Sequence, residues 1–223
     1  MFAFWMENLP ELLKGLLLSL QLFVVSTVAG LALGFGLALL GVSRHRALRW
    51  ASFVVVETGR GIPVLIMLQF VYFGLPSVGL TLESMPAAWV ALSATMACYS
   101  SEIIRGGIES IGTDQREASR ALGLTPRQTL WNIIVPQGLA VSLAPLAGFC
   151  LQMFQATSLA FALSVPELLS RAYKVANLTF RHLEILSLAG LLYAIVGLPM
   201  LLAVSRIEGG LLRRFGLKKE ATA

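Results

Sequence analysis

Residues Glu117–Pro136, EASRALGLTPRQTLWNIIVP, are charged and contain several helix start and stop residues, whereas the other long stretches of this chain are almost entirely apolar. The chain has 223 residues, of which 57% are hydrophobic and 13% are charged, and its mean hydropathy is +0.78. Soluble domains carry about 25% charged residues. The composition therefore predicts a protein whose main solvent is lipid, with the quoted stretch exposed to water at one membrane face.

Five windows without Asp, Glu, Lys or Arg are long enough to be membrane-spanning helices. A bilayer core about 30 Å thick needs about 20 helical residues, since each residue rises ~1.5 Å. The windows are 15–43, 61–82, 84–101, 128–166 and 185–205. The fourth window is too long for one span and barely long enough for two, so the distribution of charge has to decide the topology.

With five spans, most of the basic residues fall on one side of the membrane. The rich side holds the loop 43–50, the segment 105–137 and the tail that begins at Arg206 and continues with Arg213, Arg214, Lys218 and Lys219. The cations of the opposite side are Lys14, Arg171, Lys174 and Arg181. Cytoplasmic loops carry an excess of Lys and Arg. We therefore predict an all-α membrane protein with the N-terminus outside and the C-terminus in the cytoplasm.

The whole chain, 1–223, is predicted to be one membrane domain. The expected spans cover approximately 15–43, 52–76, 85–108, 139–160 and 185–206. Residues 126–136 are expected to form a cytoplasmic helix that is rigidly continuous with the fourth span. The apolar remainder of the fourth window is expected to lie within protein, because lipid does not tolerate exposed irregular backbone.

Other residue types exclude several classes of site. Cys98 and Cys150 lie inside apolar stretches and are interpreted as small buried hydrophobes, with no disulfide framework. His45 and His182 lie far apart in the sequence and predict no metal site. The first apolar stretch lacks a basic start, so we expect it to be retained as a span and not removed as a signal peptide.

The segment 112–136 carries clear helix start and stop signals. Asp114 and Glu117 have the spacing of a capping box, and Gly123 is a typical stop. Thr125 followed by Pro126 then predicts a second start. The pattern favours two short helices joined by a sharp bend, which would form a convex surface that fits a groove of a partner protein. The alternative, a solvated loop with a capping Glu117, fits these signals equally well.

The same stretch resembles the signature loop of permease subunits of bacterial ATP-binding-cassette (ABC) importers. That pattern is Glu-Ala-Ala, three residues, Gly, nine residues, Ile, one residue and Leu-Pro. The matching residues here are Glu117, Ala118, Ser119, Gly123, Ile133, Val135 and Pro136. All spacings agree, and the two departures, Ser119 for Ala and Val135 for Leu, are small.

The flanking sequences resemble one branch of that family, the polar amino acid uptake permeases. The similar stretches are 57–76, 99–111, 135–145 and 154–169. In the last of these the family usually carries Lys-Asp before Thr-Ser-Leu, whereas this chain has Gln155 and Ala156. The departure affects the expected substrate more than the expected function.

The resemblance implies a type I importer fold in the bacterial inner membrane. It also implies a second permease subunit, identical or different, two cytoplasmic ABC ATPases and a periplasmic amino-acid-binding protein. The residues expected to couple to the ATPase are Glu117, Ala118, Ser119, Gly123, Ile133 and Pro136. The chain has no Gly-rich phosphate loop ending in Gly-Lys-Ser/Thr. We therefore expect a non-catalytic subunit without a cofactor of its own, whose partner uses ATP and Mg²⁺.

Two charge pairs lie in or near the spans, each with three-residue spacing. They are Glu57 with Arg60 and Glu102 with Arg105. Residues three apart share a helix face and can neutralise each other, which favours structural or gating pairs. We expect Gly59, Gly61 and Pro63 to break an interfacial helix from the true second span, which would put Arg60 at the inner boundary.

Uncharged polar residues could line a substrate pathway through the membrane. The candidates are Gln69, Gln152, Gln155, Thr157 and Ser158. Such groups can bind a zwitterion weakly and release it, but hydrogen bonding between helices is the more common role and stays open. Gly30, Gly34 and Gly36 of the first span are interpreted as a close-packing surface.

Two other classes of protein compete with a permease subunit. A secondary transporter or channel for small polar solutes would be expected to show inverted repeats or a deep ionisable relay. A membrane enzyme would need a converging nucleophile and base, and Ser100 and Ser101 beside Glu102 have no histidine in any predicted span. The sequence favours the permease subunit, with the secondary transporter or channel as the alternative.

Overall fold

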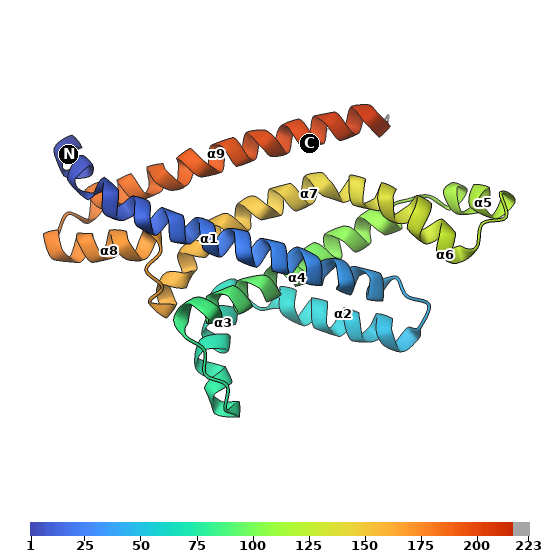
Figure 1. Cartoon of the computed structure of the whole chain (residues 1–223), viewed down its shortest axis with the longest axis horizontal. Coiled ribbons are helices and arrows are strands. Elements are labelled where there is room, and N and C mark those ends of the chain that lie inside the picture. Colours follow the sequence, from blue (N-terminus) through green and yellow to red (C-terminus); the bar gives the residue numbers. More distant parts are fainter. Residues whose placement is uncertain (216–223) are drawn as a thin grey trace.

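The computed structural model describes residues 1–215, with side chains for residues 1–204 and Arg206 (Figure 1). Every regular element in this range is helical, which confirms the predicted fold class. The long helices are α1 (Phe2–Gly41), α2 (Arg46–Gly61), α4 (Ser84–Glu109), α7 (Val135–Ala156) and α9 (His182–Phe215). The short ones are α3 (Val64–Gln69), α5 (Thr113–Ala121), α6 (Pro126–Thr129) and α8 (Leu168–Thr179). Arg213, Arg214, Lys218 and Lys219 of the predicted basic tail lie outside the described side chains.

Within residues 1–215, four helices are long and apolar enough to span a membrane, and there are five if the bent pair formed by α2 and the α3 segment is one span. The four are Phe2–Gly41, Ser84–Glu109, Pro126–Leu163 and His182–Val204. When the bent pair is counted as one span, the total equals the number that hydropathy and charge predict.

Helices α1 and α4 form the tightest pair of the bundle. Gly30 and Gly34 of α1 are buried against α4, and a Cβ on Gly30 would come within 2.4 Å of the Met96 Cβ. The predicted small-residue surface is present at these two positions. Gly36 differs, because no described atom outside its own stretch of α1 lies within 4 Å of the position that a Cβ would take there, so it faces away from the pair.

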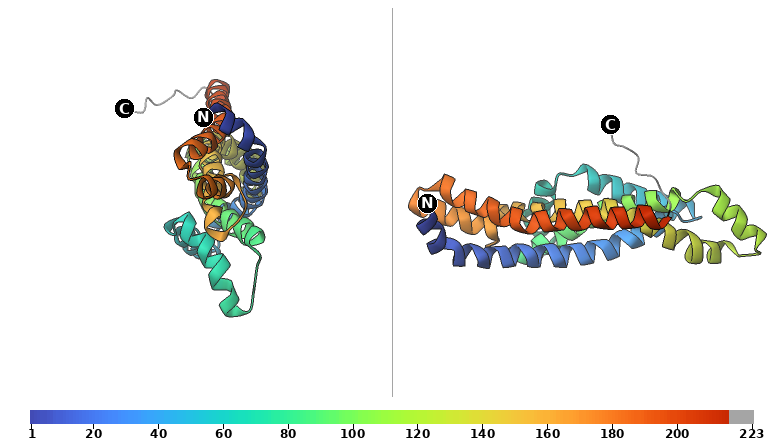
Figure 2. Two further views of the ribbon diagram at one scale, coloured as in Figure 1. Left: turned by 90° about the vertical axis from the view of Figure 1, so that its left-hand side faces the viewer. Right: turned by 90° about the horizontal axis from the view of Figure 1, so that it is seen from above.

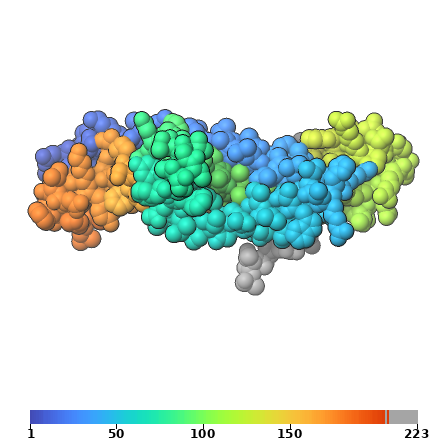
Figure 3. Space-filling model, turned by 90° about the horizontal axis from the view of Figure 1, so that it is seen from below, coloured from blue at the N-terminus to red at the C-terminus, as the bar shows by residue number. Residues whose placement is uncertain are grey.

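The second predicted span is broken. Helix α2 and the α3 segment are bent by 105° at a break of four residues or fewer, next to Pro63, as Gly61 and Pro63 predict. The α3 segment continues through a π turn, η1 (Phe70–Gly74), and a 3₁₀ turn, η2 (Leu75–Val78). Together they form an arm that leaves the bundle in the end-on view and covers its middle in the view from below (Figures 2 and 3).

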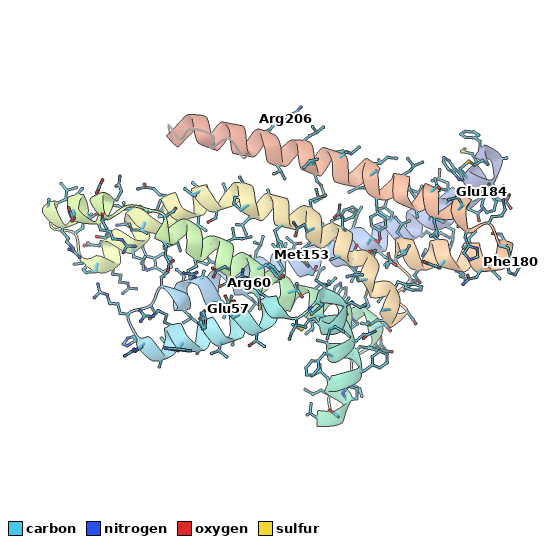
Figure 4. All side chains as sticks on the ribbon, turned by 180° about the vertical axis from the view of Figure 1, so that it is seen from behind. Glu57, Arg60, Met153, Phe180, Glu184 and Arg206 are labelled. Carbon is cyan, nitrogen blue, oxygen red and sulfur yellow. The ribbon has the colours of Figure 1, made fainter. Side chains whose placement is uncertain are left out.

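Of the three residues predicted to break this helix, Gly59 lies inside α2, and the position of Arg60 at the inner membrane boundary stays a prediction. Helix α2 runs beside α1 and α4, so Arg60 lies near the middle of the molecule's long axis (Figure 4). Small residues on one face of α2 allow this close docking. Ser52 donates a hydrogen bond to the Leu37 carbonyl, and a Cβ on Gly59 would come within 2.3 Å of the Cys98 sulfur.

The predicted cytoplasmic helix 126–136 and the fourth span form one continuous rod. From Pro126 to Ala156 the chain is helical without a break, through α6, the π turn η3 (Leu130–Ile134) and α7. Pro136 does not interrupt this rod, because a π turn precedes it and already changes the hydrogen-bond register. The apolar remainder forms the 3₁₀ helix η4 (Thr157–Leu163), which carries buried residues as expected.

The segments predicted to be cytoplasmic are directed to the end of the molecule opposite the N-terminus and α8 (Figures 1 and 2). The α1–α2 turn and the α5–α6 segment lie at one end, and the far part of α9 points toward it. The N-terminus, α8 and the start of α9 lie at the other end. The three segments predicted to be cytoplasmic are therefore directed to one end, as the five-span topology requires.

Candidate coupling segment and translocation pathway

Helix α5 ends in the motif that its glycine predicts. Gly123 has φ of +75°, the left-handed region that a side chain rarely adopts. Its N–H donates to the Arg120 carbonyl at 2.9 Å, and the Leu124 N–H donates to the Ser119 carbonyl at 3.0 Å. This is a Schellman closure, and it sets the bend between α5 and α6.

The predicted cap at the start of α5 is wrong, whereas the one at the start of α6 is correct. Helix α5 begins at Thr113 after Gly112, without a side-chain cap, so Asp114 and Glu117 form no capping box. At α6, Thr125 and Gln128 form a full box. The difference arises because Asp114 is already inside the first turn of α5, where its side chain no longer reaches the free N–H groups.

The six residues expected to couple to the ATPase differ in exposure. Glu117, Ala118, Gly123 and Pro136 are exposed, and Ile133 is half-buried. Ser119 is 1% exposed, and its hydroxyl donates to the Gln115 carbonyl. Ser119 is thus a packing residue of the bend, while the neighbouring surface of α5 is free to meet a partner.

Leu122 is the clearest contact residue that was not anticipated from the sequence. It is 77% exposed at the end of α5, the highest value among the large apolar side chains from α4 to α7. Ala118 lies one turn before it on the same helix face. An apolar side chain held this far from the bundle, on a charged segment, marks a contact surface for another protein.

The two predicted charge pairs join into one network across α2 and α4. The Glu57 Oε1 lies 2.9 Å from the Arg60 Nη1, and the Glu102 Oε1 lies 2.6 Å from the Arg105 Nη2. Arg60 also approaches Glu102 at 3.9 Å, which links the helices. Glu109, which was not anticipated, extends the network with an ion pair to Arg105. The i, i+4 spacing from Arg105 was the available sequence signal for it.

Arg60 also connects α2 to α7 through an aromatic stack. Its guanidinium lies 5.8 Å from the centre of the Tyr99 ring, and its carbonyl accepts a hydrogen bond from the Tyr99 hydroxyl at 3.1 Å. The Tyr99 ring stacks on Phe149 with centroids 4.7 Å apart. A displacement of α2 would therefore alter contacts with both α4 and α7.

The predicted pathway residues fall into two groups. Gln69, Gln152 and Gln155 are exposed, and their side-chain amides make no hydrogen bond within the described part of the chain. Thr157 is fully buried and donates to the Phe154 carbonyl, and Ser158 donates to the Gln155 carbonyl. The glutamine amides are therefore free to bind cargo or a neighbouring subunit, whereas both hydroxyls are engaged by backbone. Helix α3 packs against η4, so the arm that carries Gln69 touches the segment that follows Gln155.

A buried carboxylate at the opposite end was not anticipated. Glu167 is 0% exposed and caps α8, accepting from the N–H groups of Leu169 and Ser170 at 2.8 and 2.7 Å. Ser19 of α1 and Tyr193 of α9 donate to the same carboxylate. A glutamate directly before an apolar helical run was the sequence signal for the cap, but its partners on distant helices have no local signature.

Comparison with known proteins gives consistent matches over most of the chain. Residues 30–215 match the family described as binding-protein-dependent transport system inner membrane component. The chain is 35% identical over 187 residues to the probable amino-acid ABC transporter permease protein YckA of Bacillus subtilis, covering 84% of this chain and 83% of that protein. It is 32% identical over 208 residues to the arginine transport system permease protein ArtQ of the same organism, covering 93% and 95%.

The fold also matches a solved structure. The crystal structure of an amino acid ABC transporter with histidines superposes with a TM-score of 0.88 and 25% sequence identity, covering 93% of this chain and 97% of the other. The overall fold described above is therefore shared with another transporter chain over nearly the full length of both.

Proposed function

The chain belongs to the family of binding-protein-dependent transport system inner membrane components, and from this membership we propose that it is the permease subunit of an ATP-driven importer of polar amino acids. The amino-acid assignment rests on relatives named as amino-acid and arginine permeases. The multi-pass architecture fits a location in the bacterial inner membrane.

The observation that carries the proposal is the connection between α5, α6 and the bundle. A bent pair of short helices projects from the end that holds the basic segments, and α6 continues into α7 without a break (Figure 1). A continuous helix transmits a displacement along its length, whereas a flexible loop would absorb it. Glu117, Ala118 and Gly123, with the exposed Leu122, are the proposed contact with an ABC ATPase; Ile133 and Pro136 lie on the transmitting rod.

The partners follow from this role. Two ATPase subunits bind and hydrolyse ATP with Mg²⁺, a second permease subunit completes the pathway, and a periplasmic binding protein delivers the amino acid. The chain itself is a non-catalytic subunit and carries no cofactor. The exposed α3 arm and the N-terminal end with α8 are available for the second permease and the binding protein respectively.

The proposed pathway runs past Gln69, Gln152 and Gln155, beside the charge network of α2 and α4. Amide side chains without partners in the described part of the chain can hydrogen-bond a zwitterion without holding it tightly, which transport requires. Thr157 and Ser158 support the turn into η4 and would reach cargo only after a rearrangement. The network of Glu57, Arg60, Glu102 and Arg105 would set the spacing of α2 and α4.

The test is reconstitution of uptake. The full chain is co-expressed with an ABC ATPase and a partner permease of the same organism and purified by a tag on this chain alone. The complex is placed in liposomes, and a periplasmic amino-acid-binding protein is supplied together with labelled amino acid. We expect the ATPase to co-purify, and we expect accumulation only with ATP and Mg²⁺. A non-hydrolysable ATP analogue is the control.

One result would favour the alternative of a secondary transporter or channel. If the chain alone accumulates or equilibrates the amino acid in liposomes without any ATPase, and an ion gradient changes the rate, then ATP-driven import is wrong. Co-purification without any ATP-dependent uptake of amino acids would leave the permease role intact and reject the substrate class.

A further inference from the structure

The end of the molecule that carries the coupling segment contains a basic cavity that the transport proposal does not use. The cavity has a volume of about 670 Å³ and lies between the α1–α2 turn and the α5–α6 segment. Its basic lining residues are Arg44, His45, Arg116, Arg120 and Arg127. None of the described residues that line it is acidic.

The arginines of this cavity lack acidic partners. Among the described residues, Arg44, Arg116, Arg120 and Arg127 form no ion pair, whereas Arg60 and Arg105 each do. Four unpaired guanidinium groups around one hollow repel each other, so an anion between them would remove an unfavourable charge interaction. Guanidinium groups bind phosphate through paired N–H donors.

Apolar residues also line the cavity, and they indicate how close the cavity lies to the membrane. Leu39 and Val42, at the end of the apolar helix α1, line it together with Leu130 and Trp131. Trp131 is half-exposed, and tryptophan is enriched where membrane meets water. The cavity thus combines several basic residues with apolar residues of α1 and of the rod that continues into α7, which matches a phosphate group with an attached acyl chain.

The ATPase is a less suitable occupant because of the geometry of α5. Arg116 and Arg120 lie one turn apart and both line the cavity. Ala118 and Leu122 lie two residues further on, which is ~200° around the helix, on the opposite face. The surface proposed to meet the ATPase therefore points away from the cavity, and a partner seated on Leu122 leaves the hollow open to lipid.

We propose that this cavity binds the phosphate headgroup of an anionic phospholipid of the inner leaflet, with Arg44, Arg116, Arg120 and Arg127 around the phosphate and Trp131 against the upper acyl chain. Such a lipid would tie the α1–α2 turn to the coupling segment. Basic pockets between spans on the cytoplasmic side are suited to acidic lipid headgroups. The proposal requires only that the chain spans a membrane, so it can fail or succeed independently of the substrate.

The test uses charge-matched double variants of the full chain, purified in detergent. Arg44→Gln with Arg127→Gln removes two cations from the cavity. Arg46→Gln with Arg49→Gln removes two exposed cations from the same end but outside the cavity. Retention of added phosphatidylglycerol and of phosphatidylcholine with the same acyl chains is measured by native mass spectrometry, and folding is checked by gel filtration.

We expect the unaltered chain to retain phosphatidylglycerol about tenfold more tightly than phosphatidylcholine. The cavity variant should lose this preference, while the matched variant should change by less than about twofold. Equal losses in both variants would show general surface attraction and overturn the site. If millimolar inorganic phosphate removes the phosphatidylglycerol preference as fully as the cavity variant does, the site binds a free anion and the lipid proposal is overturned.

A second measurement addresses a protein occupant. If the cavity variant keeps its phosphatidylglycerol preference but loses co-purifying ATPase, the cavity is a protein contact and the proposal is wrong. If it loses the lipid preference and still co-purifies the ATPase, the proposal stands even where amino-acid uptake has not been detected.

Discussion

Gly34 of α1 and Ser100 of α4 lie so close together that a Cβ on Gly34 would come within 2.0 Å of the Ser100 Oγ. A backbone contact is also close, because the same Cβ would be 2.7 Å from the Ala97 carbonyl oxygen. Backbone atoms cannot move aside as the end of a flexible side chain can. The pairing of α1 with α4 therefore depends on the absence of a side chain at this position.

Gly34→Val should prevent the native pairing of these helices and abolish recovery of monodisperse protein from detergent. Overpacking of a close contact costs about 1–3 kcal/mol or more. Gly36→Val is the matched control, since it lies two residues away on the same helix with no described atom outside its own stretch of α1 within 4 Å of its Cβ position. Size-exclusion chromatography of both variants checks the prediction, and equal behaviour would contradict the packing described.

Gly123→Val should reduce ATP-dependent uptake while leaving membrane insertion unchanged. The site has open space, so the cost comes from a β-branched residue at φ of +75° and would reshape the bend. Gly123→Asn should retain most of the activity, because asparagine tolerates this conformation. Gly112→Val, at an open position of the same segment, is the second control. Uptake and ATPase activity measured together reveal uncoupling.

Unchanged uptake in Gly123→Val would reject the bend as a transmitting element. Reduced uptake in Gly112→Val to the same degree would show that any bulk in this segment is harmful, and the left-handed glycine would then carry no special role.

Glu167→Ala should destabilise the end that carries α8. The substitution removes the acceptor for two backbone N–H groups and two hydroxyl groups, and unsatisfied buried donors cost about 1–3 kcal/mol each. A fall of several degrees in the apparent melting temperature is expected. Glu83→Ala is a matched control, because Glu83 precedes α4 as an N-cap without a side-chain cap hydrogen bond. Equal shifts would contradict the role of Glu167.

Arg60 and Glu102 should show a small but measurable coupling in a double-mutant cycle. Their side chains are 32% and 29% exposed and 3.9 Å apart, so we expect about 0.5–1 kcal/mol. The variants Arg60→Gln, Glu102→Gln and the double variant are compared by thermal denaturation in detergent, at low and high salt. Additive effects would mean that the link between α2 and α4 rests on Tyr99 instead.

Gln155→Ala should lower uptake at least about fivefold while changing the apparent melting temperature by no more than about 1 °C, because its amide has no partner within the described part of the chain. Gln137→Ala, on the same helix toward the coupling end, should have little effect on either. A lowered melting temperature of the assembled complex with normal uptake would instead identify Gln155 as a contact between the two permease subunits.

Hydropathy and charge predict much of this fold. In lipid, the backbone of each span must form its hydrogen bonds within the helix, and Lys and Arg are enriched in the loops on the cytoplasmic side. The bend at Pro63 and the stop at Gly123 are equally local, since each depends on the conformation of one or two residues. The approach of Arg60 to Glu102 is different. It depends on how α2 docks on α4, and no spacing within either helix encodes that contact.

The π turn that lets the helix continue through Pro136 also has no local signature in the sequence. A proline and a change in composition normally end a helix, but the preceding turn is wide enough to accept the ring without a break. The exposed Leu122 and the buried Glu167 were missed for opposite reasons. From the sequence, an isolated leucine among charged residues is expected to be buried, and an isolated glutamate is expected to be exposed to solvent. Tertiary packing gives each of them the opposite environment here.

The π turn at Leu130–Ile134 gives the chain a specific tolerance to changes in length. Its i to i+5 bonding holds one residue more than an α-helical turn, so deleting one residue there would restore ordinary helix and preserve continuity. The deletion would leave the segment before it in nearly the same orientation relative to α7, because the wide turn takes up the extra residue within a single turn. A single-residue gap at this point in an alignment of relatives would therefore signal a lost π turn, with the docking face of α5 and α6 still in place.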